Sequence, residues 1–246
     1  MAGKVEFLSK VARSPLRIIP RSAVLPILSG PLKGKKWIIG SSRHLCWVGS
    51  YERLMQNLVV SEVGRGDILF DVGANVGFYS LLAAGLVGSG KVFAFEPLSE
   101  NVVYLRRHLH LNGINNVAVF ELAIADQVGT AHFQDEESRA MGKLTPGGNR
   151  CVAVETVDSL LAQGKIAPPT FIKMDVEGAE LKALLGARVC FDKHRPKLFL
   201  ATHGEQIHEE CYRLLRGWHY QLRSIAKEED RAEMFAFPLP AVSARV

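Results

Sequence analysis

In the stretch Phe70-Asp71-Val72-Gly73-Ala74-Asn75-Val76-Gly77, an acid and two glycines lie between a predicted strand and a predicted helix. The apolar residues 68–70 are typical of a buried strand, and the apolar residues 79–84 are typical of a helix. A cofactor site at such a turn competes with an ordinary turn whose glycines only permit close packing. We favour the cofactor site because a buried apolar run precedes the turn and an apolar helix follows it, and a second acid, Glu96, at the end of the next predicted strand strengthens this interpretation.

The composition of the turn indicates which cofactor it binds. A dinucleotide turn needs three glycines, because the middle one lets the backbone approach a pyrophosphate, and here Asn75 fills that middle position. Asp71 would lie close to the ligand, which suits a sulfonium and an ammonium group better than two phosphates. The turn therefore predicts S-adenosylmethionine rather than NAD, bound by Asp71, Gly73, Asn75 and Gly77.

The second acid stands in Phe95-Glu96-Pro97, about 20 residues beyond the glycine turn. A carboxylate at the end of this strand accepts hydrogen bonds from ribose hydroxyls in many nucleotide sites. We therefore expect Glu96 and Pro97 to contribute to the cofactor site. From the strand order, we also expect Ala123 and Ile124, in the loop after the third strand, to contact the adenine.

From residue 67 onward, short apolar strands alternate with helical stretches, the pattern of a parallel sheet covered by helices on both faces. Five strands are predicted at residues 67–72, 91–95, 117–122, 170–174 and 196–201. Helices are predicted after a Ser99 cap and over residues 178–185 and 205–215. With two closing strands at 220–224 and 231–237, the pattern predicts an α/β fold with a doubly wound, mostly parallel, seven-stranded Rossmann-like sheet.

The chain has 246 residues, 48% of them hydrophobic, which is enough to bury one sizeable core. We expect one domain over residues 66–246, preceded by an extension over residues 1–65 that acts as a lid over the substrate or as a dimerisation element in a homodimer. Within the extension, residues 27–57 are typical of a hairpin followed by a helix. Turn-rich residues 145–148 separate two further short strands, at 130–133 and 151–154.

The formal net charge is +5, and several basic residues stand early: Lys4, Lys10, Arg13, Arg17 and Arg21. This arm is either a solvated terminus or a weak contact with a membrane surface, and we favour the solvated terminus. Since no RNA-binding module is recognisable, we expect no nucleic-acid partner. No apolar run reaches the roughly 18 residues of a membrane span and no signal peptide is evident, so we expect a cytoplasmic protein.

A second candidate site follows the fourth and fifth predicted strands. Asp175 and His203 stand at the ends of these strands, where ligands of doubly wound sheets bind. An acid and an imidazole there form either a catalytic base with its orienting partner or part of a site for a divalent cation such as Mg²⁺, with Glu177 as a weaker third ligand. Glu177 and Glu180 are equally explained as acids favoured by a helix dipole. Lys173 is expected either to reach the crevice or to pair with a nearby acid.

With these segments in order, the chain resembles the FkbM family of S-adenosylmethionine-dependent methyltransferases from about residue 66 to residue 203. The resemblance rests on the glycine turn, on Phe95-Glu96-Pro97, on residues 112–117 and on Ile172-Lys173-Met174-Asp175-Val176-Glu177-Gly178-Ala179-Glu180. It implies a sheet of the class I methyltransferase type and methyl transfer to a hydroxyl of a sugar, glycolipid or polyketide-like acceptor. The partner would then be a small molecule or a glycan.

Two other functions remain open at this point. One is an RNA or protein methyltransferase, although an enzyme that methylates base amines would carry an Asn/Asp-Pro-Pro-aromatic signature where this chain has Asp175-Val176-Glu177-Gly178. The other is an inactive subunit that binds the cofactor and serves a partner. Asp175 and His203 together favour an active enzyme.

Overall fold

The computed structural model describes residues 19–42, 44–135, 142–144, 148, 150–228 and 230–239. The predicted basic arm, except Arg21, and residues 145–147 of the predicted turn lie outside this part of the chain. The chain divides into two compact units, Met1–Tyr51 and Glu52–Val246. The boundary falls before helix α3 (Arg53–Glu62), which the predicted extension included and which belongs to the second unit.

The first unit contains a hairpin, whose first strand begins before residues 27–57, where the hairpin was predicted. Strands β1 (Val24–Pro26) and β2 (Lys36–Ile38) pair antiparallel, and the 3₁₀ helix η2 (Ile39–Ser41) and helix α2 (His44–Val48) follow. Trp37 and Trp47 are buried, and the Trp47 indole donates a hydrogen bond to the Pro26 carbonyl at 3.0 Å. These two aromatic residues therefore serve a core.

The second unit is built on the predicted seven-stranded sheet. Its strands are β3 (Ile68–Val72), β4 (Lys91–Phe95), β5 (Val117–Phe120), β10 (Phe171–Met174), β11 (Lys197–His203), β12 (Tyr220–Lys227) and β13 (Arg231–Pro238). They lie in the order β12-β13-β11-β10-β3-β4-β5. Only β13 runs against its neighbours, so the sheet is mostly parallel and the predicted fold class is confirmed.

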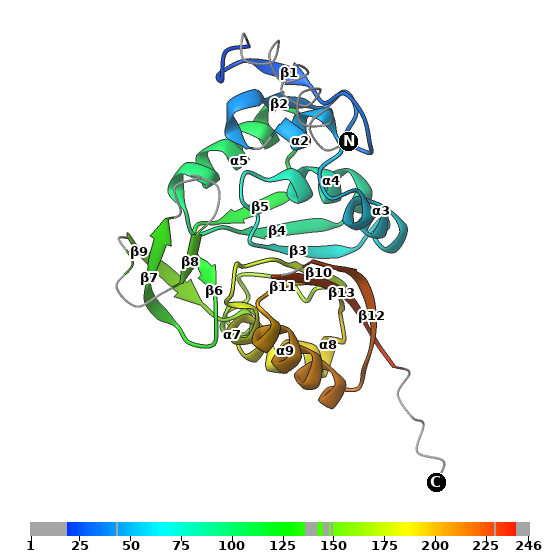
Figure 1. Cartoon of the computed structure of the whole chain (residues 1–246), viewed down its shortest axis with the longest axis vertical. Coiled ribbons are helices and arrows are strands. Elements are labelled where there is room, and N and C mark those ends of the chain that lie inside the picture. The colour runs from blue at the N-terminus through cyan, green and yellow to red at the C-terminus, as the bar shows by residue number, and fades with distance from the viewer. Residues whose placement is uncertain are drawn as a thin grey trace, which may run out of the picture. The chain divides into compact units, whose positions relative to one another are not determined.

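Helices cover both faces of this sheet (Figure 1). Helices α4 (Phe78–Val87) and α5 (Ser99–Leu111) lie on one side, and α7 (Glu180–Leu185), α8 (Arg188–His194) and α9 (Glu205–Gly217) lie on the other. The short helix α6 (Val157–Ala162) precedes β10. A core cluster that includes Phe70, Ile172 and Leu200 is almost completely buried, as expected for central parallel strands. None of the helices in the described residues has both the length and the apolar character needed to cross a membrane.

A smaller four-stranded sheet is inserted between β5 and β10. It contains β6 (Ala123–Ile124), β7 (Gly129–Asp135), β8 (Gly142–Leu144) and β9 (Arg150–Glu155), in the order β6-β9-β7-β8. Residues 123 and 124, predicted to lie in a loop, therefore pair as a strand with β9. Their side chains are buried in two hydrophobic clusters.

Two predicted helix starts differ from the structure. Ser99 is the first helical residue of α5 rather than its cap, and its hydroxyl hydrogen-bonds the Glu121 carboxylate instead of the helix backbone. Helix α7 begins at Glu180 rather than at residue 178, because Glu177 and Gly178 have positive φ angles of 53° and 100°. A left-handed backbone cannot continue into a right-handed helix, so the chain turns before α7 begins.

Candidate functional site

The order of the strands reverses between β3 and β10, so the carboxyl ends of these two strands form the switch point where doubly wound folds bind ligands. The turn after β3 packs directly on the turn after β10. Gly73 has a φ of +76°, and a Cβ atom added there would meet the Asp175 carbonyl oxygen at 1.9 Å. Only glycine allows this approach. The glycine turn and Asp175, predicted to serve two parts of one site, are thereby in contact.

The predicted ribose-binding carboxylate faces the glycine turn. One Glu96 oxygen, Oε2, accepts a hydrogen bond from the Asn75 backbone N–H at 2.8 Å. The other oxygen accepts bonds from the Leu98 backbone N–H and the Asn101 side chain, both at 3.1 Å. Burial raises the pKa of Glu96, and these hydrogen bonds oppose that rise. A carboxylate has about four acceptor positions, so the three bonds leave capacity for a ribose hydroxyl, and the residues fit a nucleoside cofactor.

The other predicted cofactor residues lie around this carboxylate. Pro97 is half-buried beside it and connects it to Leu98, the N-cap residue of α5. Asn75 adopts a left-handed conformation with a φ of 50°, and Gly77, with a φ of 89°, packs against Leu105 of α5. The turn thus carries one glycine packed on Asp175 and one packed on α5.

Asp71 is enclosed and paired with a lysine. Its side chain is fully buried, one carboxylate oxygen accepts a hydrogen bond from the Ser80 hydroxyl at 2.6 Å, and the other lies 3.2 Å from the Lys173 Nζ atom. Asp71 and Lys173 are register partners on β3 and β10. The Lys173 ammonium also donates a hydrogen bond to the Gly73 carbonyl at 2.8 Å. Lys173 therefore pairs with a nearby acid, which is the second of the two roles considered for it. It also links Asp71 to the backbone of the glycine turn.

Burial by itself would lower the pKa of Lys173. The charges of Asp71, Asp175 and Glu52 outweigh this effect and raise the pKa, so the lysine stays protonated. Lys173 is thus a charged group in a region that solvent hardly reaches, since its side chain is only 5% exposed.

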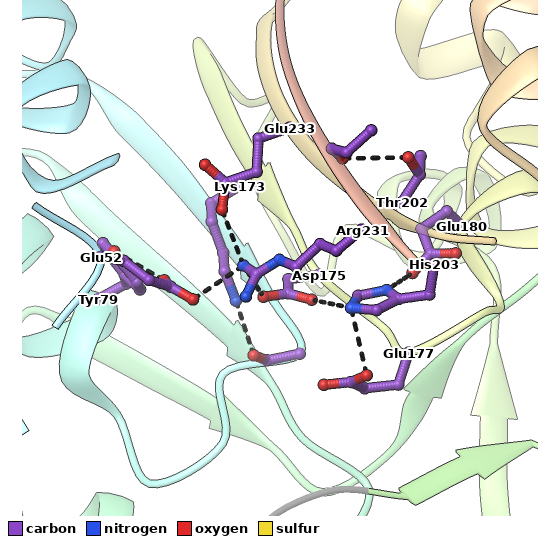
Figure 2. Close-up of polar contacts among 12 residues, drawn as sticks. Glu52, Tyr79, Lys173, Asp175, Glu177, Glu180, Thr202, His203, Arg231 and Glu233 are labelled. Atoms are coloured by element: carbon purple, nitrogen blue, oxygen red, sulfur yellow. Dashed lines mark hydrogen bonds and ion pairs between the residues drawn. The ribbon is translucent and has the colours of Figure 1, made fainter. Parts of the chain in front are cut away.

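Asp175 and His203 lie side by side, as Figure 2 shows. The distance between Asp175 Oδ1 and His203 Nε2 is 3.7 Å, and Glu177 Oε2 lies 3.2 Å from the same nitrogen. These two acids come from the turn after β10 and the histidine from the end of β11, which are adjacent parallel strands. One ligand atom from each of the three residues lies within 4.8 Å of the others. The predicted catalytic pair and the weaker third ligand are thus brought together.

The opposite nitrogen of the imidazole contacts Glu180. Its Oε1 atom lies 2.8 Å from His203 Nδ1, and the Glu180 side chain is fully buried. Burial alone would lower the pKa of His203, but the hydrogen bond to Glu180 and the charges of Asp175 and Glu177 raise it. For the neighbouring acid Glu177, burial disfavours the charged form and therefore raises the pKa.

Three further charged residues complete the cluster, and sequence reasoning missed all of them. Arg231 on β13 lies 3.3 Å from Asp175 Oδ2, 2.8 Å from Glu52 Oε1 and 3.1 Å from Glu233 Oε1. Arg231 is the register partner of His203 across the β11–β13 pair. No signal in the sequence could have found Arg231, because its place depends on how these two strands align, and their hydrophobic pattern does not show that alignment.

This arrangement can act in two ways. Asp175 Oδ1 has no hydrogen-bond partner among the described residues, and together with Glu177 Oε2 and His203 Nε2 it offers three ligand atoms to a divalent cation. Without a cation, the imidazole can exchange a proton with a group that enters the edge of the sheet. Arg231 and Glu180 hold the outer sides of Asp175 and His203 in either case.

Comparison with known proteins agrees with this architecture. The sequence profile described as the methyltransferase FkbM domain matches residues 71–222. A similar solved structure is the methyltransferase FkbM from Methylobacillus flagellatus, with a TM-score of 0.52 and 19% identity, which covers 80% of this chain and 56% of that one.

Two curated relatives are also similar in sequence. The hexuronic acid methyltransferase AglP from Haloferax volcanii is 28% identical over 131 residues, which cover 52% of this chain and 53% of the relative. An uncharacterized protein from Methanocaldococcus jannaschii is 25% identical over 144 residues, which cover 57% of this chain and 51% of the relative. The chain thus spans about half the length of the curated relatives it matches.

Proposed function

Since the chain belongs to the FkbM family of S-adenosylmethionine-dependent methyltransferases, we propose that it transfers a methyl group to an oxygen, a hydroxyl of a sugar, glycolipid or polyketide-like acceptor. The observation that carries this proposal is the contact between Gly73 of the glycine turn and the Asp175 carbonyl. It joins the expected cofactor turn to the cluster of His203 and its acids, so that methyl donor and proton acceptor would meet at one edge of the sheet.

A sugar is the acceptor class that the comparisons favour, because one curated relative is named a hexuronic acid methyltransferase. Charge favours a hydroxyl over a carboxylate as the methylated oxygen. Asp175 and Glu177 both lie beside His203 Nε2, so an anionic acceptor group that approached this nitrogen would meet charges of its own sign. A neutral hydroxyl, in contrast, needs what this cluster offers, which is a group that takes its proton.

The bound cofactor supplies an electrophilic methyl group on a sulfonium. The residues of the chain align the acceptor and remove its proton, because a neutral alcohol is a poor nucleophile. In the direct version of the mechanism, His203 Nε2 takes the hydroxyl proton and Asp175 orients the hydroxyl. Asp175 suits this orienting role because its Oδ2 atom is paired with Arg231 while its Oδ1 atom faces His203.

Loss of the Glu96 carboxylate should weaken cofactor binding. We expect Glu96→Ala to reduce the affinity for S-adenosylmethionine and S-adenosylhomocysteine by about 1–3 kcal/mol through lost charge-assisted hydrogen bonds. Calorimetry measures this, with Glu100→Ala, four residues further along the chain, as the control that should bind normally. Micromolar binding of NAD without binding of S-adenosylmethionine would overturn the cofactor assignment itself.

Removal of metal separates the two versions of the mechanism. If Asp175, His203 and Glu177 hold a divalent cation, EDTA should abolish turnover and added Mg²⁺ or Mn²⁺ should restore it. Mn²⁺ is included because an imidazole ligand suits a transition metal better than it suits Mg²⁺. Turnover that is indifferent to EDTA would favour the direct version, with His203 as the base.

The acceptor is identified with labelled cofactor. A panel of glycans, glycolipids and polyketide alcohols is incubated with the protein, and both label transfer and S-adenosylhomocysteine formation are measured. Transfer to a hydroxyl supports the proposal. Transfer to RNA or protein would support the rival enzyme class, and cofactor binding without turnover on any acceptor would support an inactive partner subunit.

A further inference from the structure

The fully buried carboxylate of Glu180 is the least expected charge in the cluster. Glu180 is the first residue of α7, and its side chain has no exposed surface. Burying a carboxylate costs free energy unless hydrogen bonds or opposite charges compensate for it. Two groups provide such compensation, since Glu180 Oε1 lies 2.8 Å from His203 Nδ1 and accepts a hydrogen bond from the Gly178 backbone N–H at 3.0 Å.

The contact with His203 determines which ring nitrogen is available for chemistry. When this carboxylate is ionised it can only accept hydrogen bonds, so the proton of the contact then sits on the Nδ1 atom of His203. The Nε2 atom then faces Asp175 and Glu177 at 3.7 and 3.2 Å. Figure 2 shows the imidazole held between Glu180 on one side and these two acids on the other.

A helix-dipole role does not account for this arrangement. An acid in the first turn of a helix is stabilised by the dipole when it remains at the surface, as Glu205 does at the start of α9. Glu180 occupies the same helical position in α7 but is buried, and it points its Oε1 atom at an imidazole from another strand. The two glutamates therefore differ in burial and in partner, although both stand in the first turn of a helix.

We propose that Glu180 is a positioning residue, which fixes the ring of His203 so that Nε2 faces the reactive edge of the sheet. This inference rests on the proposed function, in which His203 activates the acceptor hydroxyl. It applies to both versions of the mechanism, because a metal ligand and a base each need one defined ring nitrogen.

The test combines a spectroscopic signature with kinetics. In protein labelled with ¹⁵N-histidine and kept at a fixed pH with EDTA, the hydrogen-bonded Nδ1 proton of His203 is assigned by its absence from His203→Ala. In Glu180→Gln this signal should disappear from its position, because a neutral amide holds the proton more weakly than a carboxylate does. In the same variant, kcat should fall about 10–100-fold while the KM for the acceptor changes less than threefold, as is typical when an outer partner of a functional histidine is lost.

Two further variants make the test decisive. Glu205→Gln repeats the same chemical change in the first turn of a helix and should keep both the signal and kcat. Glu180→Asp keeps the charge on a shorter side chain and should recover part of both, which covers the case that Glu180→Gln does not fold. A Glu180→Gln protein that keeps the Nδ1 signal, or loses it with kcat unchanged, would overturn the proposal. The spectra need no acceptor, so a failure of the proposed function is recognised separately by the acceptor panel.

Discussion

Replacing His203 with alanine should lower turnover by about 10²–10⁴-fold, the usual contribution of a general base. The reason is geometric, because the Nε2 atom of His203 faces both Asp175 and Glu177. Asp175→Asn should lower turnover by the same order, because it removes the carboxylate beside this nitrogen. The measurement is kcat with a genuine acceptor, together with the Kd of S-adenosylmethionine, which should change little.

The matched control is His208→Ala. His208 lies on α9, and its Nδ1 atom contacts the hydroxyl of Thr202 at 3.0 Å. Thr202 directly precedes His203 in the chain, but His208 itself does not contact the acids of the cluster. Turnover of this control should stay within a few-fold of the unmodified protein. Near-normal turnover in both His203→Ala and Asp175→Asn would mean that the chemistry lies elsewhere and that these residues only shape the strand ends.

The second large effect is on stability. Lys173→Met should lower the free energy of unfolding by about 3–5 kcal/mol, because it leaves the buried carboxylate of Asp71 without its counter-charge. The Asp71 side chain is fully buried and lies 3.2 Å from the Lys173 ammonium. The same substitution removes the hydrogen bond to the Gly73 carbonyl, so cofactor affinity should fall as well. Urea denaturation and calorimetry measure the two effects.

A more exposed ion pair between a lysine and a glutamate provides the control for this substitution. Lys197 Nζ lies 2.9 Å from Glu62 Oε2, but the lysine side chain is 43% exposed, so Lys197→Met should cost no more than about 1 kcal/mol. The double variant Lys173→Met with Asp71→Asn should recover part of the loss, because no unpaired charge remains buried. Equal stability of Lys173→Met and the unmodified protein would show that the Asp71 pair contributes nothing to folding.

Local patterns in the sequence were enough to predict the sheet. The buried strand at residues 68–72 follows from the apolar run at residues 68–70, and the turn after it follows from Gly73 and Gly77, because glycine readily adopts the positive φ angles that the structure shows there. The alternation of strands and helices predicts the parallel core. The strands at whose carboxyl ends Asp71, Glu96, Asp175 and His203 stand were predicted for the same reason, and parallel strands bring these ends to one edge.

The sequence did not predict which charges would pair at that edge. The partnership of Asp71 with Lys173 depends on the register of β3 against β10, and the partnership of Arg231 with Asp175 depends on where β13 aligns against β11. A shift of one residue in either pair would turn these side chains to the opposite face of the sheet. Hydrophobic periodicity identifies a strand but leaves its register open.

The sequence by itself therefore determined the fold class, the glycine turn and the acids and imidazole that end the strands, because these depend on local periodicity and on short-range backbone geometry. Only the tertiary structure decided that Glu180 is buried against His203 Nδ1, that Lys173 neutralises Asp71 and that Arg231 joins Asp175 to Glu52. Those pairings join residues from 23 to 179 positions apart in the chain. They form only when strand register and helix packing place opposite charges together where water cannot screen them.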